Sequence, residues 1–151
     1  MLQSSLPCSS RLAALSSKNV CRNHRCVSCC YDTEMLLLED DVQRIVGLGF
    51  KEDSFAVGSE GFKMLRNKKG RCVFHDGKQC TIYSDRPAGC KLYPVIFDMD
   101  LDQPVKDELC PFREEFDLSS KAKQELSVVY AKLMDERQTT ITEKKNHNKT
   151  K

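Results

Sequence analysis

CRNHRCVSCC, the ten residues from 21 to 30, carries four of the nine cysteines in a 151-residue chain that has no tryptophan. Such a cysteine count indicates a disulfide framework, a metal site or redox chemistry. The close spacing of Cys26 and Cys29 lets one loop present two sulfurs to one centre. Thiolate is the ligand preferred by zinc and by iron–sulfur clusters. The stretch therefore predicts a metal centre, to which more distant ligands would tie the rest of the chain.

Further cysteines follow at wider spacing. The candidate metal ligands are Cys21, Cys26, Cys29, Cys30, Cys72, Cys80, Cys90 and Cys110. One zinc site needs four ligands, so eight suffice for two such sites or for one larger centre with spares. After Cys30 the next cysteine comes 42 positions later, and there is neither a second CxxC nor a pair of histidines, so the familiar zinc-finger and ribbon patterns do not fit.

The adjacent pair Cys29-Cys30 bears on the kind of centre. Because neighbouring side chains usually point apart, both would serve one mononuclear tetrahedral site only with a strained turn between them. They serve two centres, or a polynuclear cluster, or one of them lies outside the ligand set. This adjacency favours an iron–sulfur cluster over zinc as the cofactor and leaves both open.

The composition disfavours several other classes of protein. A disulfide framework needs an oxidising compartment, but the first residues lack the apolar core of a secretory signal, and the cysteine count is odd. No apolar run is long enough to span a bilayer. A net charge of +2, from 24 basic and 22 acidic residues, gives no footprint for nucleic acid. We therefore expect a cytoplasmic metal-binding protein without a membrane or strong nucleic-acid signal, and the sequence identifies no protein partner.

The predicted fold class is α+β: a small cysteine-rich, metal-stapled domain with short strands, a β-hairpin and a C-terminal amphipathic helix. Residues 1–20 read as a flexible leader, favoured over an organelle transit peptide, and 138–151 as a disordered polar tail. The cysteine-cluster domain spans 21–117, and a helix over 118–137 packs on it. Periodicity and turn residues predict strands at 33–38, 62–66 and 95–100 and helices at 39–48 and 119–137. A short helix is predicted to start in 84–90, with Ser84 or Asp85 as its cap.

The segment RCVFHDGKQCTIY, residues 71–83, predicts a β-hairpin whose register decides where two cysteines point. A two-residue loop at 76–77 would put Cys72 and Cys80 on opposite faces. A three-residue loop at 75–77 would make them face each other with Cβ atoms about 5 Å apart, near enough to share a metal. We predict the second register, with His75 exposed in the turn.

An apolar stripe runs along the C-terminal helix. It comprises Ala122, Leu126, Val129, Tyr130, Leu133 and Met134. Core packing is the simplest reading of such a stripe, and a partner-docking face is the alternative.

Taken in order, these pieces resemble the zinc- or iron-chelating cysteine-cluster family, also called the CxxCxxCC domain. The resemblance rests on CVSCC (26–30), TEM (33–35), the helix start at 40–45, GRCVF (70–74), CTIYSDRPAGCKLYP (80–94) and CPF (110–112). It implies that the metal ligands are Cys26, Cys29, Cys30, Cys72, Cys80 and Cys90, with Cys110 matching a downstream cysteine of many members. The family usually opens with CxxC, whereas Cys21 stands five positions before Cys26 and so departs from that pattern.

Three functions remain open at this point. The first is a metal-binding protein whose centre is mainly structural. The second is a cluster-dependent redox or protein-modifying enzyme, because a domain of this type also occurs in a flagellin lysine methylase. The third is a metal-stapled adaptor that docks a protein partner. Arg86 would serve an enzyme by binding an acidic substrate, although pairing with Asp85 or Asp98 is the reading we prefer. His24 is expected to be a solvated loop residue rather than a ligand.

Overall fold

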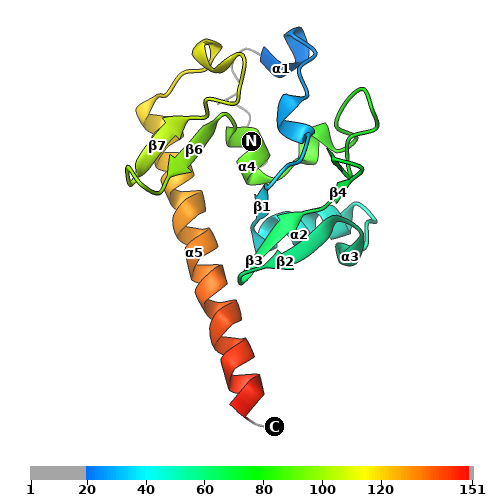
Figure 1. The fold of residues 1–151 in the computed structure, drawn as a ribbon, viewed down its shortest axis with the longest axis vertical. Coiled ribbons are helices and arrows are strands. Elements are labelled where there is room, and N and C mark those ends of the chain that lie inside the picture. Colours follow the sequence, from blue (N-terminus) through cyan, green and yellow to red (C-terminus); the bar gives the residue numbers. More distant parts are fainter. Residues whose placement is uncertain (1–19, 150–151) are drawn as a thin grey trace, which may run out of the picture.

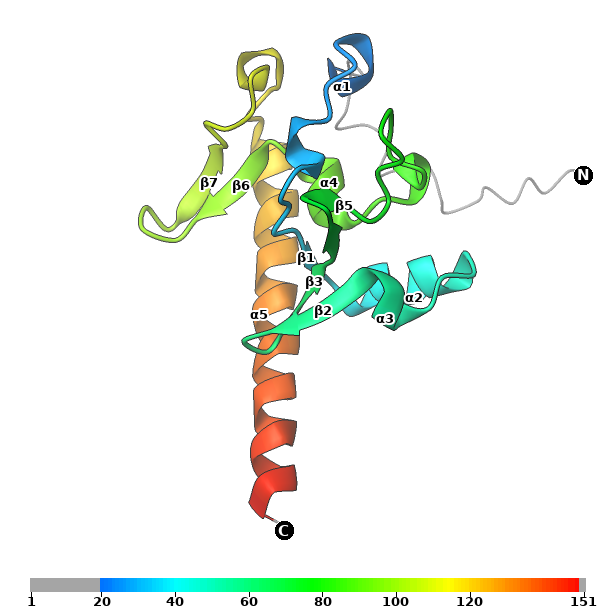
Figure 2. The ribbon, with the colours of Figure 1, turned by 45° about the vertical axis from the view of Figure 1, so that its right-hand side comes forward.

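The computed structural model describes residues 20–149. The predicted leader, apart from Val20, and Cys8 lie outside the described residues. Helices and short antiparallel strands alternate along the chain, which confirms the α+β fold class. Figure 1 shows one long helix beside two groups of shorter elements, and Figure 2 shows the same arrangement after a turn of 45°.

The N-terminal group of elements builds a three-stranded antiparallel sheet in the order β1-β3-β2. It is preceded by a turn of helix and a 3-10 turn that carry the first cysteines. The elements are α1 (Val20–Asn23), η2 (Ser28–Cys30), β1 (Leu36–Leu37), α2 (Glu39–Gly47), α3 (Glu52–Phe55), β2 (Ala56–Ser59) and β3 (Phe62–Leu65). The predicted helix over 39–48 and the predicted strand over 62–66 are confirmed.

The core of this group forms where α2 turns its apolar face to the sheet. Val42 and Ile45 lie three positions apart on that face and are completely buried, as is Phe55. They pack with Leu37 and Leu65 of the sheet in one apolar cluster. Acidic residues in the first turn of α2 suit its macrodipole, and Gly49 follows the helix with φ +99°, a conformation that ends helices.

A buried carboxylate, Asp41, joins this group to the cysteine-bearing segment. Its Oδ2 accepts a hydrogen bond from the Leu38 N–H at 3.1 Å, which satisfies the start of α2. Its Oδ1 accepts from the Ala88 N–H at 3.0 Å, at the start of α4 (Ala88–Leu92). Arg44 donates to the same oxygen and to the carbonyl oxygen of Arg86. The predicted side-chain cap of α4 by Ser84 or Asp85 is wrong, because Asp41 from a distant helix satisfies that N–H instead.

The segment that follows the sheet is held by short pairings. β4 (Asn67–Lys68) pairs with β5 (Arg71–Cys72), and η3 (Tyr83–Asp85) precedes α4. The predicted register of the 71–83 hairpin, with a three-residue loop at 75–77, is wrong, and the alternative two-residue loop does not occur either. Cys72 pairs with Asn67, and the later pairing is His75 with Cys80, closed by the Asp76 N–H donating to the Gln79 carbonyl. Asp76 decides this turn, since its carboxylate accepts from the N–H groups of Lys78 and Gln79.

The C-terminal part consists of a hairpin and a long helix, and the helix packs on the hairpin and on the N-terminal group. β6 (Val95–Asp98) pairs with β7 (Gln103–Lys106), and η4 (Arg113–Glu115) leads to α5 (Ser120–Lys149). The predicted strand at 95–100 is confirmed over its first four residues. No helix in the described range, 20–149, combines the length and the apolar character needed to cross a membrane.

The helix α5 is longer than the sequence predicts. The tail over 138–151 is predicted to be disordered, but the structure continues the helix to Lys149. One reason is tertiary packing: Ile141 lies against Gly61 in the β2–β3 turn, and Arg137 donates to the Glu60 carbonyl at 3.0 Å. Beyond that turn α5 projects past the other elements (Figure 1).

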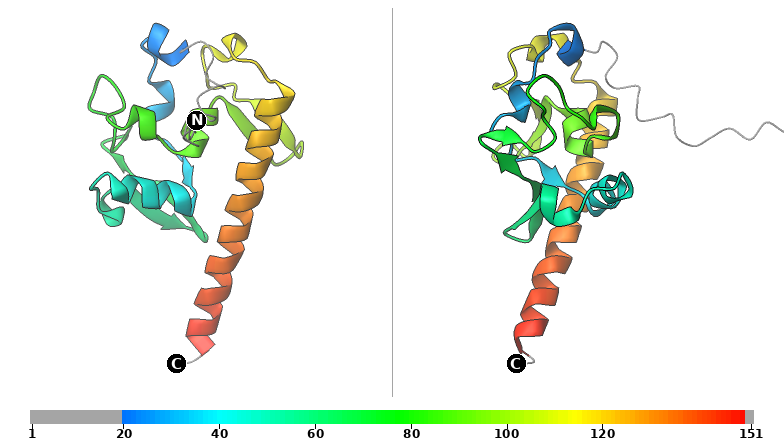
Figure 3. Two further views of the ribbon diagram at one scale, coloured as in Figure 1. Left: turned by 180° about the vertical axis from the view of Figure 1, so that it is seen from behind. Right: turned by 90° about the vertical axis from the view of Figure 1, so that its right-hand side faces the viewer.

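The apolar stripe of α5 packs against the rest of the fold. Ala122 and Leu126 are buried, and Leu126 lies in a cluster with Leu92 and Val95. Tyr130 stacks on Phe97 with ring centroids 4.0 Å apart. These contacts agree with the predicted core packing of the stripe, whose other members, Val129, Leu133 and Met134, are half-buried. Figure 3 shows from behind how the upper half of α5 runs along the β6–β7 hairpin and the N-terminal group of elements.

Candidate metal centre

One cavity of about 370 Å³ lies between the cysteine loop, the β5–α4 segment and the chain leading into α5. Seven cysteines line it: Cys21, Cys26, Cys29, Cys30, Cys72, Cys80 and Cys90. The eighth, Cys110, does not line this cavity and is buried at 5% exposure. All eight are free thiols. Segments that are far apart in the sequence thus bring their predicted ligand residues to one place.

Local structure explains how each cysteine reaches the cavity. Cys29 and Cys30 lie in the 3-10 turn η2, and Cys72 ends strand β5. Cys80 is fixed by its backbone bridge to His75. Cys90 sits in α4, which approaches the sheet closely because Gly89 has no side chain: a Cβ at Gly89 would overlap the sulfur of Met35.

The thiols influence one another electrostatically. The Cys30 thiol hydrogen-bonds to Cys29, which lowers the pKa of Cys29 to about 7 and raises the pKa of Cys30. Burial, together with the neighbouring Cys29 thiolate, raises the pKa of Cys21 to about 11 and also raises the pKa of Cys90. Because burying several thiolates together is unfavourable without a counter-charge, the cavity favours a cation among the sulfurs.

Arg86 supplies a positive counter-charge near the thiols. The prediction that it pairs with Asp85 or Asp98 is wrong: among residues 20–149 it forms no ion pair. Its Nη1 donates to the Tyr83 carbonyl at 2.7 Å, and its guanidinium lies 4.0 Å from the centre of the Tyr83 ring. The positive charge of Arg86 acts to lower the pKa of Cys21, Cys29, Cys80 and Cys90.

Four more basic residues, none of them predicted as a site residue, line the same cavity. They are Arg22, Arg25, Lys78 and Lys91. In the described part of the chain none of them forms an ion pair. The pKa of Lys91 is lowered by burial and by the charges of Arg44 and Arg86. Two of these cations stand inside CRNHRCVSCC, and their place between cysteines is the sequence signal that could have revealed them.

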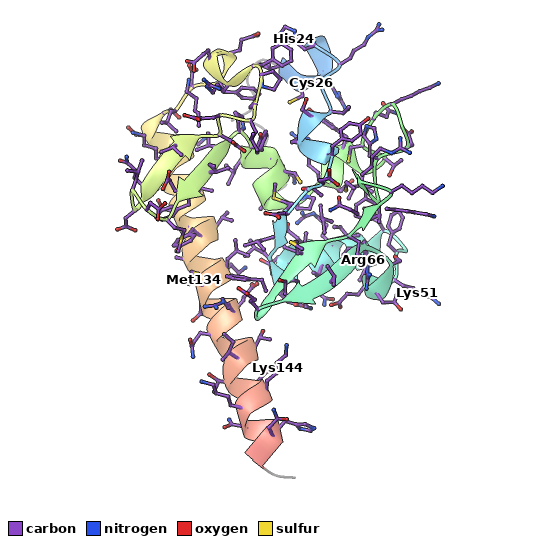
Figure 4. The ribbon with its side chains drawn as sticks, viewed as in Figure 1. His24, Cys26, Lys51, Arg66, Met134 and Lys144 are labelled. Atoms are coloured by element: carbon purple, nitrogen blue, oxygen red, sulfur yellow. The ribbon has the colours of Figure 1, made fainter. Side chains whose placement is uncertain are left out.

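The two histidines near the site differ in their exposure. His24 is exposed, as expected; it also stacks on Phe112, with ring centroids 3.8 Å apart, and its Nε2 lies 2.7 Å from Glu115 Oε1. Figure 4 shows His24 beside Cys26 at the end of the molecule opposite the tip of α5. The prediction that His75 is exposed is wrong: it is 6% exposed, its Nδ1 accepts from the Gly77 N–H, and its Nε2 has no partner among the described residues.

The donor set of this site suits zinc or iron, because soft thiolates select these metals. Within residues 20–149, however, no three Cys, His, Asp or Glu side chains already converge in a metal-binding geometry. The thiols therefore line the cavity walls without forming a closed ligand set. A bound metal would therefore have to draw sulfurs from several walls together.

Comparison with known protein families gives one match. Residues 20–111 fit the family model CxxCxxCC, described as a "Putative zinc- or iron-chelating domain". The matched range includes all eight candidate cysteines and ends one residue before Phe112. The searches of curated proteins and of solved structures returned no match.

Proposed function

Because the chain belongs to the CxxCxxCC family of zinc- or iron-chelating domains, we propose that its cysteine thiolates hold an iron–sulfur cluster or zinc, with the cluster preferred. One observation carries the proposal: seven cysteines from separate segments line a single cavity. The proposed ligands are the lining cysteines together with Cys110. All eight described cysteines are free, which supports a reducing compartment such as the cytoplasm.

Two features support a cluster over a single zinc ion. A cavity of about 370 Å³ exceeds what one ion among four thiolates requires. Cys29 and Cys30 are neighbours in a 3-10 turn, where successive side chains diverge by about 120°. Iron–sulfur clusters present several metal atoms to their ligands, so diverging thiolates suit a cluster better than a single ion.

The residues of this chain have distinct tasks toward such a centre. The thiols lose their protons on binding, so metal uptake releases protons. Arg86 supplies a positive charge that offsets the negative charge of the assembled thiolates. When bound, the metal would join the cysteine loop to segments far along the chain, including the 41-residue interval between Cys30 and Cys72.

Elemental analysis and absorption spectroscopy of anaerobically purified protein test the proposal. We expect stoichiometric iron and sulfide with broad absorbance near roughly 400 nm, as thiolate-bound clusters show. Stoichiometric zinc in a colourless protein would select the zinc alternative. Protein that binds neither metal, even after anaerobic reconstitution, would contradict both. A variant with Cys8→Ser serves as the control, since Cys8 is not among the proposed ligands.

A second candidate function, a cluster-dependent redox or protein-modifying enzyme, is favoured by the open cavity. Arg22 and Arg86 both place their guanidinium groups over the Tyr83 ring, at 4.2 and 4.0 Å from its centre. Five cations that form no ion pair with any residue of 20–149 line the cavity, which suits an anionic substrate beside the metal.

Small anions test whether the centre has an open edge. Cyanide added to the reduced, loaded protein should change its electron paramagnetic resonance spectrum if a metal position is accessible. Arg86→Gln should weaken this response, while Lys51→Gln, a change at an exposed residue that does not line the cavity, should leave it unaltered. An unchanged spectrum at saturating cyanide would exclude the enzyme candidate and keep the structural one.

A further inference from the structure

The candidate ligands differ in what they pack against. Four cysteines belong to the apolar core under the sheet: Cys72 is a buried member of it, and Cys30, Cys80 and Cys90 pack against its surface. The same cluster contains Val42 and Phe55, which are fully buried. These four sulfurs therefore sit on the part of the fold with the most complete packing. We call them the core set.

The other four cysteines do not belong to that cluster. Cys21, Cys26 and Cys29 come from the loop that opens the described chain, and Cys110 comes from the segment that leads into α5. We call these four residues the terminal set.

Contacts beyond the cysteines hold the two segments of the terminal set together. His24 stacks on Phe112 with ring centroids 3.8 Å apart, and its Nε2 lies 2.7 Å from Glu115 Oε1. These contacts place the residues on either side of the loop cysteines close to the residues that follow Cys110. The meeting of the segments therefore does not depend on the thiols alone.

The division between the sets falls between two adjacent residues. Cys29 and Cys30 lie in the 3-10 turn Ser28–Cys30, whose tight winding turns successive side chains by about 120°. Cys30 packs on the apolar core, and Cys29 does not.

We propose that the chain holds two metal centres, one on the core set Cys30, Cys72, Cys80 and Cys90 and one on the terminal set Cys21, Cys26, Cys29 and Cys110. Each set supplies four thiolates, the number that a tetrahedral zinc site or a cubane cluster takes. The proposal rests on the proposed function, because it assumes that the thiols bind metal. It adds that Cys21 and Cys110 are ligands of a second centre, which fastens the loop 20–30 to the segment before α5.

Cobalt(II) is a suitable probe of the ligand sets, since it takes tetrahedral thiolate sites and is coloured and paramagnetic. The full chain, freed of metal and reduced under anaerobic conditions, is titrated with cobalt and followed by thiolate-to-metal absorption and electron paramagnetic resonance. We expect two equivalents per chain, with a resonance signal that grows in proportion to both. Cys110→Ser should leave one four-thiolate equivalent, Cys90→Ser should leave the other, and Cys8→Ser should leave two.

Three results would count against the two centres in different ways. A single equivalent whose spectrum is lost in Cys110→Ser and in Cys90→Ser alike would show one shared site. Two equivalents whose resonance signal is quenched on filling would show a thiolate-bridged pair, with Cys29 the bridge between the sets. No binding at all would overturn the proposed function itself.

Cys90→Ser, a change next to the core, carries a risk of unfolding, which far-ultraviolet circular dichroism would detect. If it unfolds, Cys80→Ser takes its place in the core set. Hydrogen exchange gives a further readout in the Cys110→Ser protein. Amides of residues 20–30 and 107–116 should exchange faster, while those of β1–β3 keep their protection. Equal loss of protection in both regions would contradict a separate terminal centre.

Discussion

The sheet region and the cysteine region of this molecule are stabilised in different ways. The sheet region, 36–65, pairs the four-residue strands β2 and β3 in a continuous antiparallel ladder, with the two-residue β1 on the other side of β3, over an apolar core with fully buried side chains. The cysteine region comprises 20–35, 67–92 and 107–116. It has two-residue strands, single bridges and 3-10 turns, and a cavity lies between its segments. The comparison teaches that hydrogen bonds and apolar packing are continuous in one region and sparse in the other, where the proposed metal centre would add further bonds.

Metal removal is the change with the largest expected effect. Structural zinc contributes about 10–16 kcal/mol in small domains, which matches or exceeds the stability of an ordinary domain. After treatment with a strong chelator under reducing conditions, we expect loss of the cooperative thermal transition. Residual hydrogen-exchange protection should then be confined to the sheet region. A full transition in metal-free protein would show that the cysteine region folds without its centre.

Phe55→Ala tests the apolar side of the comparison. The Phe55 ring is fully buried against Phe74, with ring centroids 5.7 Å apart, so its removal leaves a cavity. Such truncations cost about 3–5 kcal/mol, measurable by urea denaturation of the metal-loaded protein. Val128→Ala, at a side chain 63% exposed on α5, should change stability by less than about 0.5 kcal/mol. A similar loss for both would refute this account of the core.

Asp41→Asn tests the link between the two regions. Asp41 accepts from Leu38, Ala88 and Arg44, and the change replaces one carboxylate oxygen by a donor that none of these N–H groups can use. We expect a cost of about 1–3 kcal/mol, with faster exchange at the start of α4. The matched control is Asp40→Asn, whose exposed carboxylate pairs with Lys132 at the surface and is worth under about 1 kcal/mol. Equal costs for the two changes would contradict the link.

A surface ion pair gives the smallest expected effect. Hydrogen bonds from Lys63 and Gln43 hold the pKa of Glu39 below its usual 4.5. Because the folded pKa is the lower one, the stabilisation is complete above pH 4.5 and is lost as the pH falls through the folded value. Its size is a few tenths of a kcal/mol, since the pair is solvent-exposed. In Glu39→Gln this part of the pH dependence of stability, measured by urea denaturation from pH 7 to pH 3, should disappear.

Much of the local structure could be predicted from the sequence. The helix over 39–48, the strand at 62–66 and the α5 stripe follow from periodicity and end signals, which act over a few residues. The long extension of α5 could not be predicted, because a polar sequence such as TTITEKK gives no signal for the packing of Ile141 against the β2–β3 turn. The hairpin register could not be predicted either. The Asp76 carboxylate accepts from the N–H groups of Lys78 and Gln79, so the turn ends at Gln79, two positions beyond the predicted end at Gly77.

By itself the sequence determined the chemistry of this protein, because nine cysteines with this spacing supply soft donors whatever their arrangement. Only the tertiary structure decided which sulfurs pack together on the apolar core, and that Cys30 does so while its neighbour Cys29 does not. It also decided that Arg86 faces thiols instead of a carboxylate. The physical reason is range. Ligand type and helix periodicity are properties of single residues and short segments, whereas the grouping of sulfurs depends on contacts between segments that are far apart in the chain.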